Sequence, residues 1–219
     1  MASFLITCTN ATCAVPEAYR DLFNGAEELV SSEEGWEPGA LNLAQGLAMK
    51  FRTPLIHGEV TRLLIDLEQD GETRWSNISK KLPEATRDKI VTRLEEKFRN
   101  AIEARLAEDF KRHDAVIHLL IHTAPVADGK ILFEYVGSPR AAEIAKAAAG
   151  LLPSEVDSSA VPLADETPFV RWLTANFASE KYGFVRLTVS HSFFLRSVPM
   201  RWETLKKSLN QALVNAAKG

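Results

Sequence analysis

The sequence predicts a single α/β domain in three layers, with a mostly parallel or mixed sheet covered by helices on both faces. Short apolar segments typical of buried strands alternate along the chain with longer segments whose apolar residues recur at steps of four. The length of 219 residues suits one α/β domain, and the 46% hydrophobic and 25% charged residues are ordinary for a globular protein. We therefore expect residues 1–219 to form one domain.

The first half of the chain predicts two strands and two helices. An apolar run near the N-terminus, rich in β-branched residues, predicts a buried first strand. Apolar residues at steps of four predict a helix that opens at Pro38 and a second, much longer helix. Of the two apolar segments between these helices, the later one is the more continuous and is the predicted strand. These elements are expected at residues 3–8, 38–51, 63–65 and 84–113.

The second half predicts three more strands and three more helices. A continuous apolar strand is followed by the turn pair Asp128 and Gly129, which indicates that the next strand pairs with it. Pro139 and Pro168 each open a helical pattern. The strands are expected at residues 115–122, 131–136 and 185–194, and the helices at 139–152, 168–179 and 200–217.

Charge and cysteine content exclude several classes of protein. A net charge of −3 and an isoelectric point near 6.0 provide no general attraction for nucleic acid. The N-terminal apolar run is much shorter than a signal peptide core or a membrane span, so we expect no membrane association and a cytoplasmic protein. Cys8 and Cys13 are too few for a disulfide framework and lack the second half of a zinc-binding set, and we expect both to be reduced.

Polar residues at strand ends are the candidates for a functional site. In open α/β sheets, ligands bind outside the carboxyl ends of the strands, which here are expected at Thr9, Asn10 and His122. His118 and His122 share one face of their strand because side chains alternate with a period of two. We interpret His118, which lies deeper, as a hydrogen-bonded core residue. His122 is the better site residue, since a neutral imidazole there can bind a metal or exchange a proton.

Charged residues elsewhere offer two further candidates. Glu33 and Glu37 precede a helix, so they form either an exposed acidic turn that suits the helix dipole or an oxygen ligand or acid/base group in the site. Trp36 would anchor this loop. Arg62 and Asp66 are four residues apart beside the predicted strand, and they form either a structural ion pair or a site that orients an anionic ligand.

Several segments together resemble the N-formylglutamate amidohydrolase family, which consists of zinc-dependent hydrolases with an α/β fold related to zinc exopeptidases. The resemblance covers roughly residues 5–195. Its most specific pieces, in the family's order and spacing, are CTNATCAVP at residues 8–16, GWEPGA at 35–40, TRLLIDL at 61–67, and HLLIH at 118–122 followed by Asp128 and Gly129.

The resemblance assigns roles to particular residues, and several of the family's groups are replaced. His122 matches an expected metal ligand, with Thr123 in place of a serine, and Arg62 and Asp66 match the third motif. Asn10 stands where the family has a metal-site histidine, and Thr188 stands where it has the glutamate that acts as acid and base. The other replacements are Thr9 for an acid, Glu33 for a histidine, Glu37 for an aspartate, and Glu68 and Gln69 for the asparagine and arginine of the third motif.

Two functions follow from this pattern. In the first, the chain is a metal-dependent amidohydrolase that cleaves the amide bond of a small acidic N-acyl amino acid, a C–N bond that is not a peptide bond. Zinc is the implied cofactor. In the second, the chain is a catalytically inactive relative that keeps the pocket to bind a small ligand or a partner, because Thr188 cannot move protons as a carboxylate does. The metal candidates are His122, Glu33 and Glu37, the substrate candidates are Arg62, Asn10 and Arg140, and His191 is a candidate for the missing catalytic group.

Overall fold

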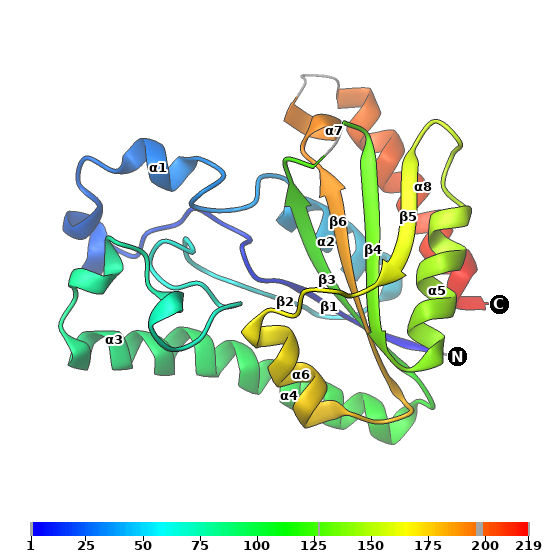
Figure 1. Cartoon of the computed structure of the whole chain (residues 1–219), viewed down its shortest axis with the longest axis horizontal. Helices are drawn as coiled ribbons and strands as arrows, with labels where there is room; N and C mark the ends of the chain where they lie inside the picture. The colour runs from blue at the N-terminus through cyan, green and yellow to red at the C-terminus, as the bar shows by residue number, and fades with distance from the viewer. Residues whose placement is uncertain (1, 127, 196–198, 219) are drawn as a thin grey trace.

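In the part of the chain that the structure describes, the sheet contains six strands in the order β2-β1-β3-β6-β4-β5. The computed structural model describes residues 2–126, 128–195 and 199–218. Strands β2, β1, β3 and β6 run parallel to one another, whereas β4 is antiparallel to β6 and parallel to β5 (Figure 1). The strands are β1 Ser3–Cys8, β2 Leu55–His57, β3 Val116–Ala124, β4 Lys130–Gly137, β5 Asp157–Pro162 and β6 Tyr182–Ser190.

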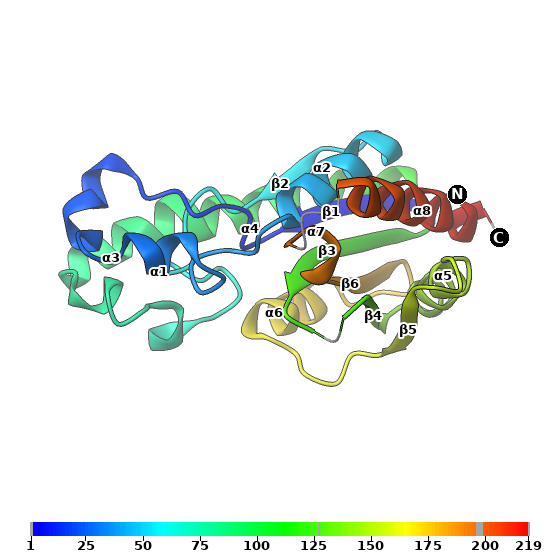
Figure 2. The ribbon, with the colours of Figure 1, turned by 90° about the horizontal axis from the view of Figure 1, so that it is seen from above.

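Helices cover both faces of this sheet, as Figure 2 shows from above. One face packs against α2 (Ala40–Phe51), α5 (Pro139–Gly150) and α8 (Pro199–Lys218), and the other packs against α4 (Lys97–Arg112) and α6 (Pro168–Phe177). The pleat of the strands separates the two cores, since Phe4 and Ile6 face the first and Leu5 faces the second. The predicted mixed, three-layer α/β architecture is confirmed. None of the described helices is long and apolar enough to cross a membrane.

Short elements form a projection beyond the carboxyl end of β1, on the left of Figure 1. These elements are the 3-10 segments Glu17–Phe23, Gly71–Arg74 and Ser79–Lys81 together with α1 (Glu27–Ser31) and α3 (Glu84–Ile90). A π-helical segment, Val91–Glu96, joins α3 to α4, so the expected long helix runs without a break but contains one wider stretch. A last short helix, α7, spans Ser192–Leu195.

Two predictions about the sheet were wrong. Residues 63–65 are not a strand; Leu64 and Ile65 are buried in a loop, and Leu55–His57 is the strand instead. Continuous apolar sequence indicates burial, and in this segment the burial comes from a loop packed on the second core. Strands β3 and β4 do not pair, because β6 lies between them and bonds to both. The strand expected at 185–194 is β6, which begins earlier, at Tyr182, and ends earlier, at Ser190.

Candidate functional site

His122 lies near the carboxyl end of β3, where the residue is almost completely buried at 8% exposure. The register of the sheet places Thr188 of β6 directly beside it. His122 and Thr188, which the family resemblance assigns to the same site, are therefore neighbours on two parallel strands. His118 lies four residues earlier and is fully buried, and each of its ring nitrogens has a hydrogen-bonding partner. Thr7 Oγ1 lies 2.8 Å from Nε2, and the Tyr182 hydroxyl lies 2.9 Å from Nδ1.

Glu37 contacts one side of the His122 ring. The Nδ1 of His122 donates to the Glu37 carboxylate, whose oxygens lie 2.9 and 3.0 Å away, and the backbone N–H of Thr123 donates to the same carboxylate at 3.1 Å. The backbone N–H of Glu37 donates to the carbonyl of Asn10 at 2.9 Å. These contacts tie the loop before α2 to the ends of β1 and β3.

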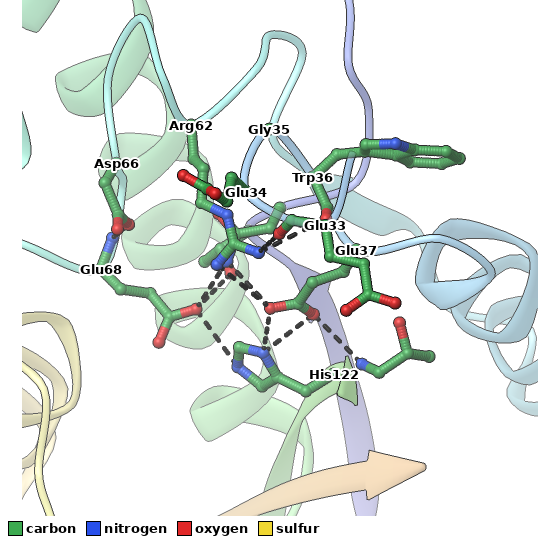
Figure 3. A network of polar contacts seen from close by, with 12 residues as sticks. Glu33, Glu34, Gly35, Trp36, Glu37, Arg62, Asp66, Glu68 and His122 are labelled. Atoms are coloured by element: carbon green, nitrogen blue, oxygen red, sulfur yellow. Dashed lines mark hydrogen bonds and ion pairs between the residues drawn. The ribbon is translucent and has the colours of Figure 1, made fainter. Parts of the chain in front are cut away.

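Glu68 approaches the opposite side of the ring, and sequence reasoning did not select it. Its Oε1 lies 3.2 Å from Nε2 of His122 and accepts a hydrogen bond of 2.5 Å from the hydroxyl of Thr9. Glu68 is only 6% exposed. The sequence offered one indication of its role: Glu68 replaces the asparagine of the family's third motif, which places an acidic group immediately after the TRLLIDL segment. Figure 3 shows Glu37 and Glu68 on either side of His122.

Asn10 and Arg62 complete the cluster around the two carboxylates. The amide Nδ2 of Asn10 donates to Glu37 at 3.1 Å and, more weakly, to Glu68 at 3.5 Å. Arg62 places Nη1 3.8 Å from Glu37, while its Nη2 donates to the backbone carbonyl of Glu33 at 2.6 Å. We call Asn10, Glu37, Arg62, Glu68 and His122 the strand-end cluster.

Burial and charge together determine the protonation of the strand-end cluster. Burial alone would lower the pKa of His122, but the negative charges of Glu37 and Glu68 outweigh it and raise this pKa to about 9. Burial likewise acts to raise the pKa of Glu37, but the charge and hydrogen bond of His122 lower it overall. With His122 and Arg62 positive and both glutamates negative, the four charges of the cluster balance, as buried charges must.

Asp66 stands beside the cluster in a less favourable environment. Burial, followed by the charge of Glu68, raises its pKa to about 6. Its Oδ1 accepts a hydrogen bond of 2.9 Å from the backbone N–H of Glu68. The structure shows no ion pair between Asp66 and Arg62 among the described residues, so the structural ion pair considered from the sequence does not form.

Three of the other residues that the sequence singled out lie outside the cluster. Glu33 pairs with His191, whose Nδ1 donates to Glu33 Oε1 at 2.6 Å and whose buried Nε2 has no hydrogen-bond partner. Glu33 and His191 therefore pair with each other, whereas the ion-pair partners of His122 among the described residues are Glu37 and Glu68. Arg140 begins α5, donates to the carbonyl of Ala217 at 3.1 Å and lines a pocket with Ala2 near the start of β1, so the structure does not bring it to the cluster.

The strand-end cluster does not fit a catalytic zinc in this arrangement. Such a site takes three protein ligands and keeps one position open. Glu37 and Glu68 approach different nitrogens of one imidazole ring, so a metal bound to Nδ1 cannot share both carboxylates. Asn10 directs N–H groups, not a lone pair, at both carboxylates. Within residues 2–126, 128–195 and 199–218, no group of three His, Cys, Asp or Glu side chains is arranged to hold a metal.

Comparisons with known proteins relate the chain to solved structures. No protein-family model matches it, and no curated protein is significantly similar in sequence. The gene product Atu2144 from Agrobacterium tumefaciens is 20% identical with a TM-score of 0.78, and the match covers 99% of this chain and 91% of that one. The N-formylglutamate amidohydrolase from Ralstonia eutropha JMP134 is 15% identical with a TM-score of 0.65, and the match covers 100% and 94%. These matches confirm the resemblance at the level of the fold: this chain has the fold of an N-formylglutamate amidohydrolase.

Proposed function

We propose that this protein is a relative of the N-formylglutamate amidohydrolases that does not hydrolyse amides and acts by binding a small ligand. One observation carries the first half of the proposal: both ring nitrogens of His122 face carboxylates, Glu37 on one side and Glu68 on the other. A metal-dependent amidohydrolase needs an imidazole lone pair for its metal and an open coordination position for water. In the strand-end cluster, Nδ1 of His122 is hydrogen-bonded to Glu37, and Nε2 lies 3.2 Å from the carboxylate of Glu68, so a carboxylate faces each nitrogen.

The absence of a carboxylate on β6 supports the same conclusion. Hydrolysis of an amide also needs a group that takes a proton from water and passes it to the leaving nitrogen. Thr188 occupies the place beside His122 where the family resemblance expects that glutamate. A hydroxyl does not ionise near neutral pH, so Thr188 cannot take over this role. Glu37 is held by His122, Thr123 and Asn10, which keeps its carboxylate occupied.

A second candidate function is hydrolysis of a small acidic N-acyl amino acid with zinc as cofactor. The observation that favours it is the fold shared with the Ralstonia eutropha N-formylglutamate amidohydrolase over the whole chain. In this alternative, Arg62 would bind the carboxylate of the substrate through the guanidinium that now lies near Glu37. His122 would then have to lose its proton and turn a nitrogen from a carboxylate to the metal.

Zinc loading followed by an activity assay separates the two functions. The purified chain is incubated with zinc, dialysed and subjected to elemental analysis, and then assayed with N-formylglutamate and N-acetylglutamate. We expect less than stoichiometric zinc and no turnover. Retention of one zinc per chain with turnover that His122→Ala abolishes would establish the hydrolase and reject our proposal. Turnover that is equal in wild type and His122→Ala would reject our proposal and would also reject a catalytic role for His122.

The proposal includes a reducing compartment, which for this chain we take to be the cytoplasm. Cys8 and Cys13 are both free, and Cys8 is completely buried. Burial, followed by the charges of Glu37 and Glu68, raises the pKa of the Cys8 thiol well above its usual value. Cys8 is therefore an unreactive core residue, and the fold requires no oxidising environment.

A further inference from the structure

A pocket of about 200 Å³ lies between the edge strand β2 and helix α4, away from the strand-end cluster. Most of its wall is apolar. Leu55 and Ile56 come from β2, Leu94 from the π-helical segment, and Phe98 and Ala101 from α4; Val60 and Leu67 close it. We propose that this pocket binds a small monocarboxylic acid with an apolar body, and that Lys97 binds the carboxylate.

The size of the pocket sets the size of the apolar body. An apolar cavity of about 150 Å³ is large enough for benzene. The pocket here is moderately larger, so it accommodates roughly six to nine non-hydrogen atoms on the same scale. Two small residues keep it open: Ala101 on α4 and Gly58 after β2. A larger residue cannot replace Gly58, because a Cβ atom there would lie 2.0 Å from the carbonyl oxygen of Thr9.

The rim of the pocket offers a cation to the carboxylate of an acid. The lining carries one ammonium group, that of Lys97, and one carboxylate, that of Glu59. Lys97 Nζ donates to both oxygens of Glu59, at 2.8 and 3.0 Å, and the two side chains are 64% and 54% exposed. An exposed ion pair of this kind contributes little, so a ligand carboxylate can take the place of Glu59 at small cost.

The edge of the sheet adds a hydrogen-bond donor that suits a carboxylate. Cys8 lies opposite His57 in the parallel register, and the N–H of Gly58 donates to the carbonyl of Cys8. In such a ladder the residues on either side of His57 bond to β1, so the backbone N–H of His57 itself is directed away from β1, toward the open edge. The ring of His57 keeps its position by donating from Nδ1 to the carbonyl of Gly58 at 2.8 Å.

The helix that forms the other wall also has an unusual feature at this point. The six residues Val91–Glu96 form a π-helix, Leu94 within it lines the pocket, and Lys97 follows directly after it. π-Helical turns are rare and occur frequently at functional sites. The wider turn therefore contains one apolar residue of the pocket wall, Leu94, and directly precedes the proposed carboxylate partner, Lys97.

Hexanoate is the probe for this inference, which rests on the proposed ligand-binding role. We would titrate hexanoate, hexan-1-ol and hexan-1-amine into the full chain and follow the methyl NMR signals of Leu55, Ile56, Leu67, Leu94 and Ala101. We expect saturable shifts with hexanoate and a Kd of about 1 mM or below, a range suited to eight non-hydrogen atoms. The amine should bind more weakly than the alcohol.

Substitutions at the rim test the role of Lys97 without altering the core. Lys97→Met should weaken hexanoate binding about two- to fivefold, to the level of hexan-1-ol, which is the scale of an exposed charge pair. Glu59→Gln should strengthen hexanoate binding, because it releases Lys97. Equal affinity for hexanoate and hexan-1-amine, or no effect of Lys97→Met, would overturn the assignment of an acid.

A matched pair on α4 tests the location. Ala101→Trp should fill the pocket and abolish the shifts, whereas Ala104→Trp, on the same helix but outside the pocket lining, should leave them unchanged. If hexanoate at 20 mM, a concentration of about twenty Kd values, shifts none of the five methyl signals, the pocket is not a ligand site. Neither result alters the zinc and turnover measurements, so a failed pocket and a failed non-hydrolytic proposal remain distinguishable.

Discussion

Glu68 lies 3.2 Å from Nε2 of His122, on the side of the ring opposite to Glu37. One imidazole therefore serves two buried carboxylates that come from different loops. Because each carboxylate is almost excluded from water, the positive charge of the ring is what makes their burial tolerable. The cluster thus resembles a buried ion triad more closely than a set of metal ligands, and its consequences are measurable in the stability of the protein.

Removal of the His122 ring should destabilise the protein strongly. His122→Ala leaves Glu37 and Glu68 buried without their shared cation, and breaking a buried charge network in this way costs about 3–5 kcal/mol. The free energy of unfolding from urea denaturation measures the loss. His57→Ala, at a partly exposed position, is the control and should cost about 1 kcal/mol or less. A loss for His122→Ala no larger than that of the control would contradict the triad.

The stability of the wild type should decrease between pH 6.5 and 9 because of His122. Its pKa is raised from 6.5 to about 9 in the folded chain, so below pH 6.5 both states hold the proton and the stabilisation is complete. Above pH 6.5 only the folded chain keeps the His122 proton. The free energy of unfolding therefore decreases with pH until His122 in the folded chain loses this proton, and the total decrease is about 3 kcal/mol. Urea denaturation across this range, with His122→Ala as reference, measures the difference. A parallel pH profile in both proteins would refute it.

His118 should give the opposite dependence of stability on pH, although it lies only four residues from His122. Burial lowers its pKa to about 3, so the folded chain keeps this ring neutral. The unfolded chain takes up the proton below pH 6.5, and stability should therefore fall as the pH decreases from 6.5 toward 3. NMR titration of the imidazole protons should show His122 titrating near pH 9 and His118 unchanged down to pH 4. Titration of His118 near 6.5 would show that its bonds to Thr7 and Tyr182 do not hold in solution.

A second imidazole at position 10 should give the chain a zinc site. Asn10→His would place a ring nitrogen beside Glu37 and His122, and so supply the third protein ligand that a catalytic zinc requires. We expect Asn10→His to retain close to one zinc per chain after dialysis, whereas Asn10→Gln, the control for side-chain size, retains little. Elemental analysis measures both. If the two variants retain equal zinc, the residue at position 10 is not what prevents metal binding.

Two glycine substitutions should have opposite effects on stability. Gly58→Ala forces a Cβ against the Thr9 carbonyl, 2.0 Å away, and overpacking of this kind costs about 1–3 kcal/mol. Gly46 lies within α2 with nothing near its missing side chain, so Gly46→Ala should stabilise by about 0.5–1 kcal/mol. Thermal and urea denaturation measure both. A neutral Gly58→Ala would mean that the loop after β2 moves freely away from β1.

The strongest local patterns predicted the fold well. The apolar run that ends in His122 and the helix with apolar residues from Ile90 to Phe110 both form where expected, since each buries a continuous face. Strand β5 was not predicted, because Asp157–Pro162 lies at an edge and its polar serines give no apolar alternation. The pairing of the strands was also out of reach, since the pattern of one strand does not identify its neighbour.

The site was predicted only in part for a related reason. His122 was identifiable because a polar residue at the tip of a buried strand has few structural explanations. Glu68 lies in a loop whose course depends on contacts with residues far away in the sequence. One of them is the hydrogen bond that Glu68 accepts from the hydroxyl of Thr9. Nothing local to residue 68 indicates burial. Glu33 and Glu37, only four residues apart, pair with different histidines, a division set by the turn between them.

The position of β6 between β3 and β4 also affects how the chain can fold. Both neighbours are synthesised first, but neither can complete its hydrogen bonds until residues 182–190 are available. A nascent chain that ends before that point leaves β3 and β4 with open edges, and such edges are prone to pair with other chains. The sheet therefore depends on sequence-distant contacts, which slow folding. Of the described strands, the inner strand β6 is the last to leave the ribosome.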